Sequence, residues 1–442
     1  MPDGAGNTPV VVAGSHHALR CMAWAIARLV FCGSMANMSH VALGGSNTLG
    51  AQDVGKPDWW RRSRSFSTQL QAFLQSHSNL TYRNSAVGGM GPILAASCMR
   101  KFVPSDARLA TVEYIPNMGY TEEDSDEMAA LERLIRTLVL RAAQVFVINI
   151  VPGSLRFVRC VGRSRRYGCQ TRLHVKDISD RVAALAMRYN ASVIVVDDDV
   201  RGDLFNADHM HVSQKGHDEI FAQIVRQVDL GRFARRHAAS RESHDVAGAP
   251  LDMGVECMIG DDIAPLIRRR GAFSRVQLDR RTPPKVGWES RTPNARLTLC
   301  VPLPRSSSNE STSVRRYRLG LGMQVAGPHY VPRHGVLRVS CHGMCHCKCF
   351  KRSDRTDCLN NSYDTMTRSD ASVTKFFRYF LTLRPHMRSS PCGPRNCLLR
   401  LHSADDPGRN RLVLRSVIVG IDDWHTNWLN EYHQDYANMG AL

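Results

Sequence analysis

Between residues 40 and 230 the chain alternates short apolar runs with segments of helical periodicity, and this alternation limits its possible folds more than any other feature. The runs QVFVINIV (144–151) and ASVIVVD (191–197) are continuous and rich in β-branched residues, as strands buried on both faces are. Strands that alternate with helices predict a parallel sheet with helices on both faces. The expected helices cover residues 66–77, 122–143, 174–190 and 213–228, and the expected strands precede Ser46 or cover residues 80–87, 107–115, 144–151 and 191–197.

The pattern changes after residue 230. Residues 231–284 are largely polar and are predicted to be a linker. The apolar runs that follow are strand-like and have no long helical segment between them, which predicts an antiparallel β-sandwich over residues 285–425. Residues 1–39 are an N-terminal segment and residues 426–442 a tail.

Polar residues and glycines follow the expected strands of the first domain, where each strand ends. They are Ser46, Gly89, Asn117 and the pair Asp208 and His211. In an open parallel sheet, ligands bind outside the carboxyl ends of the strands, so these residues are expected to meet at one edge.

This set of residue types suits hydrolysis by a serine. The Ser46 hydroxyl is a weak nucleophile that needs a base, which His211 can supply, and Asp208 can hold the imidazole in the required tautomer. The backbone N–H groups of Ser46 and Gly89 and the side-chain amide of Asn117 can form an oxyanion hole.

Each of these residues also has an ordinary structural interpretation. Gly-Gly-Ser often marks only a turn, and a single histidine is usually structural. His209 and His217 compete with His211 for the role of base. The acids that compete with Asp208 are Asp197, Asp198, Asp199 and Asp203.

Four sequence blocks together resemble those of the SGNH hydrolases, the GDSL esterase and lipase superfamily. In chain order they are GGSNT (44–48), NSAVGG (84–89), EYIPN (113–117) and DHMH followed by SQKGH (208–217). The resemblance implies a flavodoxin-like three-layer fold over residues 40–230, with Ser46, His211 and Asp208 as the triad and Ser46, Gly89 and Asn117 as the oxyanion hole. It implies a carboxylic ester hydrolase that needs no cofactor and no metal.

The chain departs from the family pattern at three positions. Gly45 replaces the aspartate of the first block, Met118 replaces an aspartate that often follows the asparagine, and Pro116 precedes Asn117. These departures concern the geometry of the loops rather than the presence of the triad. The β extension with its Cys-x-Cys segment resembles those that follow SGNH domains in algae and plants.

Of the fourteen cysteines, seven lie between residues 341 and 397. A zinc site is not expected, because the paired spacing of zinc ligands is missing and alternate residues of an extended segment face opposite ways. Such a local cluster favours disulfides, with Cys300 as the nearest partner for a leftover thiol. The candidates are Cys341, Cys345, Cys347, Cys349, Cys358, Cys392 and Cys397.

The formal net charge of +18 suggests a polyanionic partner. The basic residues are mostly arginines scattered through both halves of the chain, without one block of interleaved aromatic residues, so we expect no nucleic acid partner. The expected partner is an ester substrate, which an acylated polysaccharide could provide. The alternatives are a non-catalytic glycan- or surface-binding protein on the same scaffold and an acyltransferase that uses the same triad.

No stretch of 18 apolar residues occurs, so no membrane-spanning helix is expected. The run CMAWAIARLVFCGSMA (21–36) resembles the apolar core of a signal peptide, although Arg28 interrupts it. Together with the cysteine cluster, this run slightly favours a secreted protein.

Overall fold

The fold was analysed in a computed structural model of the chain. It describes residues 39–50, 64–76, 81–118, 124–141, 144–153, 172–228, 255–278, 286–304, 316–325, 333–349, 362–365, 373–383, 391–393, 396–403, 405 and 409–421. The possible signal region at 21–36 and the tail at 426–442 lie outside these residues.

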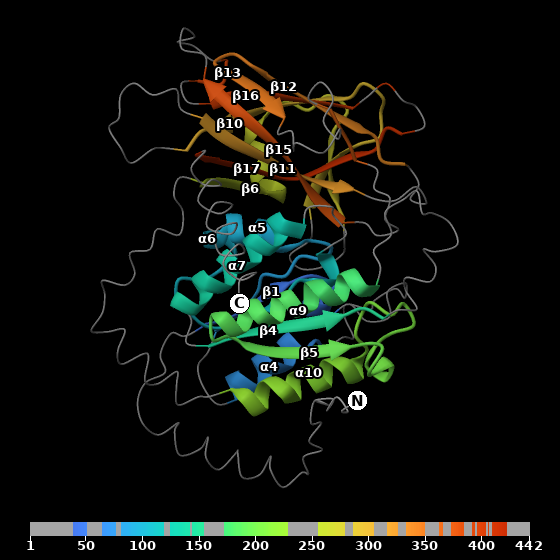
Figure 1. The fold of residues 1–442 in the computed structure, drawn as a ribbon. Helices are drawn as coiled ribbons and strands as arrows, with labels where there is room; N and C mark the ends of the chain where they lie inside the picture. The colour runs from blue at the N-terminus through green and yellow to red at the C-terminus, as the bar shows by residue number, and fades with distance from the viewer. Residues whose placement is uncertain are drawn as a thin grey trace, which may run out of the picture.

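The first part of the chain forms a five-stranded parallel sheet, as the alternation of strands and helices predicts (Figure 1). The strand order is β2-β1-β3-β4-β5, which is the order of flavodoxin-like sheets. Every residue of β4 is buried, as its continuous apolar sequence indicates. The strands are β1 (Ser39–Gly44), β2 (Thr81–Asn84), β3 (Ala107–Glu113), β4 (Gln144–Val151) and β5 (Ser192–Asp197).

Helices cover both faces of this sheet. Leu70 and Ile220 pack with Phe146 on one face, and Leu94 and Leu134 pack with other strand residues on the opposite face. Ser65 and Ser213 cap two of the helices, because their side chains accept hydrogen bonds from backbone N–H groups of the first turn. One face carries α4 (Phe66–Gln75) and α10 (Gln214–Gln227), and the other carries α5 (Pro92–Ser97), α6 (Met99–Phe102), α7 (Asp124–Arg141) and α9 (Arg172–Arg188).

The second part of the chain consists of two antiparallel sheets, in orders β14-β12-β16-β10-β7 and β13-β15-β11-β17-β9-β8, with β6 paired to β17. Leu299 and Leu401 of the first sheet share one apolar core with Leu319 and Leu414 of the second, so the two sheets form a sandwich. The strands are β6 (Val255–Ile259), β7 (Ile267–Arg269), β8 (Ser274–Gln277), β9 (Val286–Ser290), β10 (Arg296–Pro302), β11 (Arg316–Val325), β12 (Val336–His342), β13 (Cys345–Cys349), β14 (Ser362–Asp364), β15 (Val373–Leu383), β16 (Asn396–Ser403) and β17 (Leu412–Ile421).

The expected linker requires correction. Residues 231–284 contain β6, β7, β8 and the 3₁₀ segment Gly260–Leu266, so the sandwich begins by Val255 rather than at residue 285. Several of these strands lie at sheet edges and expose charged residues such as Arg268 and Arg269. Edge strands tolerate such residues because only one side of the strand is paired, and the sequence therefore reads as polar.

Disulfides join the strands of the sandwich. Cys300 pairs with Cys392, Cys341 with Cys347, and Cys345 with Cys397. Cys349 is also disulfide-bonded, whereas Cys358 lies outside the described residues.

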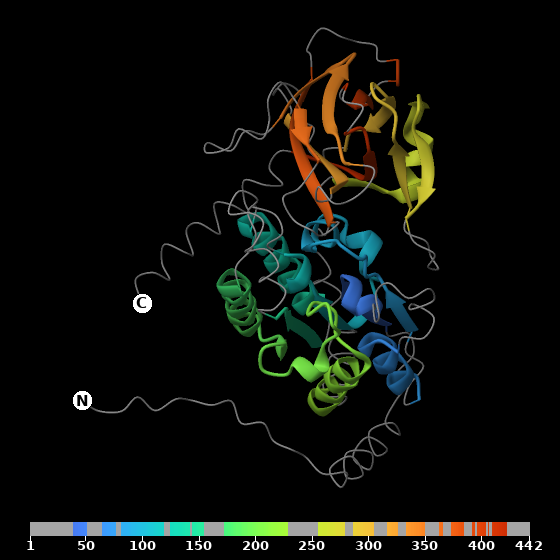
Figure 2. The same cartoon turned by 90° about the vertical axis from the view of Figure 1, so that its right-hand side faces the viewer.

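A further disulfide, Cys98–Cys257, joins α5–α6 of the first domain to β6 of the second. Phe376 of β15 and Ile418 of β17 pack into the apolar core of the first domain. Figure 2 shows the sandwich seated on the end of the α/β domain that carries α5 and α6. The two domains therefore share a packed and covalently joined interface.

No helix within the described part of the chain is both long and apolar enough to cross a membrane.

Candidate active site

Ser46 lies directly after β1, at the start of the one-turn helix α2 (Ser46–Leu49). It is half-buried, whereas the residues around it in the turn, Gly45 and Asn47, are buried. The first N–H groups of a helix have no partner within the helix, so the backbone N–H of Ser46 can donate to a bound group.

Glu113 at the end of β3 holds this turn. Its Oε2 accepts hydrogen bonds from Gly45 N at 3.2 Å, Thr48 N at 3.2 Å and Thr48 Oγ1 at 3.0 Å. Burial raises the pKa of the Glu113 carboxyl to about 7, although these hydrogen bonds act in the opposite direction. Its Oε1 is buried and has no partner among the described residues.

A Glu113→Gln variant is expected to remove one component of the pH dependence of stability. In the native chain the folded state keeps the Glu113 proton up to about pH 7, whereas the unfolded state loses it near 4.5. The folded state therefore binds more protons between these values, and the free energy of unfolding falls by about 3 kcal/mol as the pH rises across this window. The glutamine variant should lack this fall in the free energy of unfolding, because its side chain does not titrate. Its amide oxygen still provides an acceptor for the turn.

Urea unfolding of both proteins at several pH values measures the effect. The difference between the two free energies isolates Glu113 from buried histidines such as His40 and His217, which burial keeps neutral. A difference that stays constant from pH 4.5 to pH 7 would contradict this assignment. Glu113→Ala serves as a comparison, because it also removes the acceptor.

The loop between β5 and α10 carries Asp208 and His211. Asp208 Oδ1 accepts from Met210 N at 3.0 Å and from His211 N at 2.9 Å, which folds the loop back on the carboxylate. The other carboxylate oxygen is thereby directed to the His211 ring. The spacing of three residues is short enough for both contacts to form within one turn.

Ser46, His211 and Asp208 form a continuous hydrogen-bonded chain. Ser46 Oγ lies 2.8 Å from His211 Nε2, and His211 Nδ1 lies 2.5 Å from Asp208 Oδ2. Desolvation acts to raise the pKa of Asp208, but the hydrogen bonds and charge of His211 outweigh it and hold that pKa well below its ordinary value. An ionised Asp208 only accepts, so Nδ1 carries the proton and Nε2 is left to accept from the serine.

The competing histidines have other partners. His209 Nδ1 lies 2.8 Å from Asp198 Oδ2, and the backbone of His209 is left-handed with φ 53°. His217 is buried beside Phe66, whose backbone N–H donates to Nδ1 at 3.4 Å, and burial lowers the pKa of His217 to about 3.

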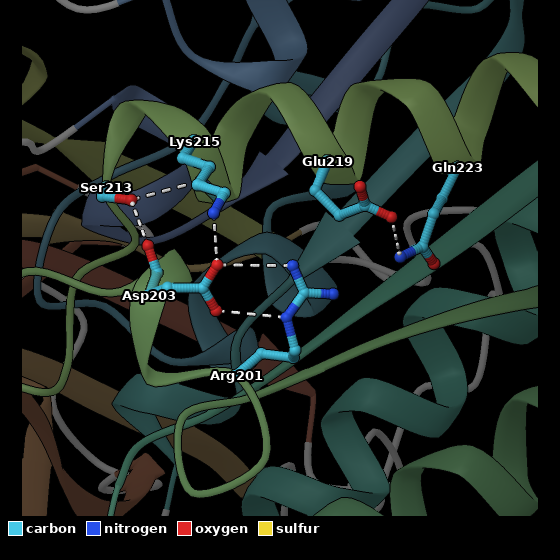
Figure 3. Close-up of polar contacts among 7 residues, drawn as sticks. Arg201, Asp203, Ser213, Lys215, Glu219 and Gln223 are labelled. Atoms are coloured by element: carbon cyan, nitrogen blue, oxygen red, sulfur yellow. Dashed lines mark hydrogen bonds and ion pairs between the residues drawn. The ribbon is translucent and has the colours of Figure 1, made fainter. Parts of the chain in front are cut away.

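The competing acids are likewise engaged. Figure 3 shows Asp203 turned toward Arg201 and Lys215, at the start of α10. Asp198 is bound to His209, and Asp197 accepts from the Asp199 backbone N–H at 2.9 Å. Among the five acids, the structure brings Asp208 to the His211 ring.

The side-chain amide of Asn117 lies against the turn that carries Gly45 and Ser46. A Cβ placed on Gly45 would come 1.8 Å from Asn117 Nδ2, so no side chain fits at position 45 in this arrangement. Asn117 Nδ2 is buried and has no hydrogen-bond partner within the described residues. Glycine at position 45 thus leaves room for this buried amide group beside the turn that carries Ser46.

Gly89 reaches the same edge from β2. The segment after β2 continues along β1, with Val87 N donating to Gly44 O at 2.8 Å, and Gly89 follows two residues later with φ 68°. This backbone conformation favours glycine. The second domain supports the turn, because Thr374 N donates to Gly89 O at 2.8 Å and Arg415 donates to the Thr374 hydroxyl.

Sequence reasoning assigned no role to Asn47. Its buried side chain accepts from Val212 N at 2.9 Å and donates to Met210 O at 3.4 Å, which connects the turn that carries Ser46 to the loop that carries His211. Glu113 was noted only as part of a block. Both residues are polar and stand where an apolar strand ends, which is the sequence signal that could have identified them.

A metal centre has no support in the described part of the chain, where no group of three or more His, Cys, Asp and Glu side chains is placed to hold an ion.

Comparisons with known proteins give a fold likeness only. No protein-family profile and no curated protein matches the sequence. Among solved structures, a two-domain esterase (CEX) active on acetylated mannans is 14% identical with a TM-score of 0.47, over 92% of this chain and 95% of that chain.

Two other solved structures match a smaller share of the chain. Axe2, an acetylxylan esterase from Geobacillus stearothermophilus, is 14% identical over 44% of this chain and 94% of its own, with a TM-score of 0.32. The esterase EstA from Pseudoalteromonas sp. is 15% identical over 42% and 94%, with a TM-score of 0.31. Because all these TM-scores are below 0.5, the function of this chain has to be argued from its own site.

Proposed function

We propose that this chain is a serine esterase of the SGNH type that cleaves carboxylic esters through an acyl-enzyme intermediate. The observation that carries the proposal is the hydrogen-bonded chain from Ser46 Oγ through the His211 ring to Asp208. It supplies a nucleophile, a base with its free nitrogen toward that nucleophile, and a carboxylate that orients the base.

In the acylation step, Ser46 Oγ attacks the ester carbonyl carbon while His211 Nε2 takes the hydroxyl proton. The carbonyl oxygen becomes negative and accepts from the N–H groups of Ser46 and Gly89 and from the amide of Asn117. Collapse of the tetrahedral intermediate breaks the bond to the alcohol oxygen, and His211 gives its proton to the departing alcohol. Asp208 stabilises the imidazolium that exists between these two transfers.

Deacylation repeats the same transfers with water. His211 takes a proton from the water that attacks the acyl carbon, and the carbon–Oγ bond breaks as the proton returns to Ser46. The products are the carboxylic acid and the free enzyme, so no cofactor enters the balance.

The proposed substrates are short acyl or acetyl esters carried on a polysaccharide. Support comes from the second domain, which contacts the Gly89 turn through Thr374 and is held to the first domain by Cys98–Cys257. A rigidly joined sandwich beside the site suits a polymeric ester better than a small free one.

Labelling with a fluorophosphonate, followed by peptide mapping, tests the proposal without assuming a substrate. We expect one modified peptide, which contains Ser46, and no labelling after denaturation. Labelling at another serine, or none in the folded protein, would contradict a serine hydrolase centred on Ser46.

Replacing Asn117 by alanine is expected to lower kcat by about 10²–10³-fold with a smaller change in KM, because an oxyanion donor acts mainly in the transition state. Since Asn117 Nδ2 has no partner in the described structure, its loss breaks no other hydrogen bond of that nitrogen. Steady-state kinetics on p-nitrophenyl acetate measures the effect. A variant with unchanged kcat would remove Asn117 from the oxyanion hole.

A further inference from the structure

A cluster of arginines lies on the outer face of the β14-β12-β16-β10-β7 sheet. Register places Arg338 of β12 opposite His402 of β16, which is in turn opposite Arg296 of β10. In the next row Arg400 of β16 lies opposite Thr298, and Thr298 is opposite Arg269 of β7. We call this set the basic face; its members are Arg269, Arg296, Arg338, Arg400 and His402.

The basic face points away from the core. Along β12, β16 and β10 the alternate residues, such as Leu337, Leu401 and Leu297, are buried in the sandwich. The four arginines of the basic face are exposed, and His402 is half-buried. The face therefore presents a flat layer of cationic side chains.

These arginines lack the carboxylate partners that several arginines of the first domain have. Arg188, Arg201 and Arg226 of the first domain each pair with a carboxylate. The four arginines of the basic face form no ion pair with any side chain that the structure describes. The sequences of β10, β12 and β16 contain no aspartate or glutamate, and the edge strand β14 of this sheet carries Asp364, in register with Val336.

The arrangement has a cost to the fold. Like charges on facing positions of neighbouring strands are destabilising, and no carboxylate on these strands offsets them. His402 lies among these positive charges, and its pKa is lowered first by burial and then by the charges of Arg296, Arg400 and Arg338 among others. Each of the three strands is anchored by a disulfide: Cys300 of β10 to Cys392, Cys341 of β12 to Cys347 of β13, and Cys397 of β16 to Cys345 of β13.

We propose that the basic face binds a polyanionic polysaccharide, one that carries carboxylate or sulfate groups, and that this polymer bears the ester which the first domain cleaves. The second half of this statement rests on the proposed function; the first half does not. Guanidinium groups bind carboxylate and sulfate oxygens through paired N–H donors. Adjacent strands lie about 4.8 Å apart, so the face spans about 14 Å across four strands and matches a repeating anion rather than a single small one.

Nucleic acid fits this face less well. Proteins that bind single strands on a sheet stack the bases on aromatic side chains, and β10, β12 and β16 carry no Phe, Tyr or Trp. The major groove of duplex DNA admits a helix or a two-stranded ribbon, whereas this face is the side of a five-stranded sheet.

Binding measurements on the full chain test the proposal. By titration calorimetry we expect binding to polygalacturonate or dextran sulfate and much weaker binding to neutral mannan. Comparing the first two polymers shows whether carboxylate or sulfate groups are preferred. The double variant Arg338→Gln/Arg400→Gln should raise Kd by about tenfold or more. The control Arg188→Gln/Arg226→Gln removes the same charge from the first domain and should leave Kd nearly unchanged.

Two further readouts separate binding from folding and from catalysis. Because the sheet variant relieves repulsion, its Tm should equal or exceed that of the native chain, and its turnover of p-nitrophenyl acetate should be unchanged. The proposal would be overturned if Arg338→Gln/Arg400→Gln kept the native Kd, or if the control variant lost as much affinity. It would also be overturned if neutral mannan bound equally well, or if single-stranded or duplex DNA bound more tightly than the polysaccharides. A chain that binds polyanions but hydrolyses no ester would retain the basic face and contradict the proposed function.

Discussion

A Ser46→Ala variant is expected to fold like the native chain and to lose ester hydrolysis by about 10⁴–10⁶-fold in kcat. The Ser46 hydroxyl is half-buried at the end of β1 and its hydrogen bond is to His211, so its removal leaves the core intact. What the variant loses is the hydroxyl that forms the acyl-enzyme in the proposed mechanism. Turnover of p-nitrophenyl acetate measures the loss, and the Tm shows that the fold is preserved.

Ser85→Ala is the matched control. Ser85 follows β2 at the same edge of the sheet, but its hydroxyl donates to Phe102 O at 2.7 Å. This variant should keep most of its activity. Native kcat in a folded Ser46→Ala variant would end the serine-esterase proposal.

Replacing His211 by alanine is expected to reduce kcat almost as much as replacing Ser46, because nucleophile and base act as one unit. The loop should keep its shape, since Asp208 Oδ1 still accepts from the backbone N–H groups of residues 210 and 211. Steady-state kinetics on the same ester measures the effect.

The neighbouring histidines provide the controls. His209→Ala removes the bond to Asp198 and should lower kcat by less than about tenfold, because His209 positions the loop without contacting Ser46. His217→Ala leaves a cavity beside Phe66 and should lower the Tm, while kcat of the folded variant changes little. If His209→Ala were the inactive variant, the assignment of the base to His211 would be wrong.

Central strands of the first domain such as β4 could be predicted because burial on both faces restricts their sequences to apolar residues at most positions. A strand buried on both faces is nearly continuously apolar, so the run 144–151 is recognised in the sequence and matches β4 to the residue. The edge strands of the sandwich obey no such rule. Charged residues at 268–270 suit an exposed edge as well as a linker, and only pairing with β10 identifies β7.

The cysteines show the same division. Their clustering is visible in the sequence, but a disulfide depends on which strands lie side by side. Cys345 is two residues from Cys347, yet it pairs with Cys397, 52 positions away, and Cys347 pairs back to Cys341. Spacing along one strand carries no information about the strand beside it.

For the candidate site, the sequence by itself determined the residue types and the edge of the sheet where they lie, because the carboxyl ends of parallel strands are on one side. It did not determine partners. Three histidines lie within nine residues, and the tertiary structure decided that His211 faces Ser46 while His209 faces Asp198 and His217 enters the core. The reason is physical: sequence specifies which groups can donate or accept, whereas burial and distance, set by the whole fold, specify which of them meet.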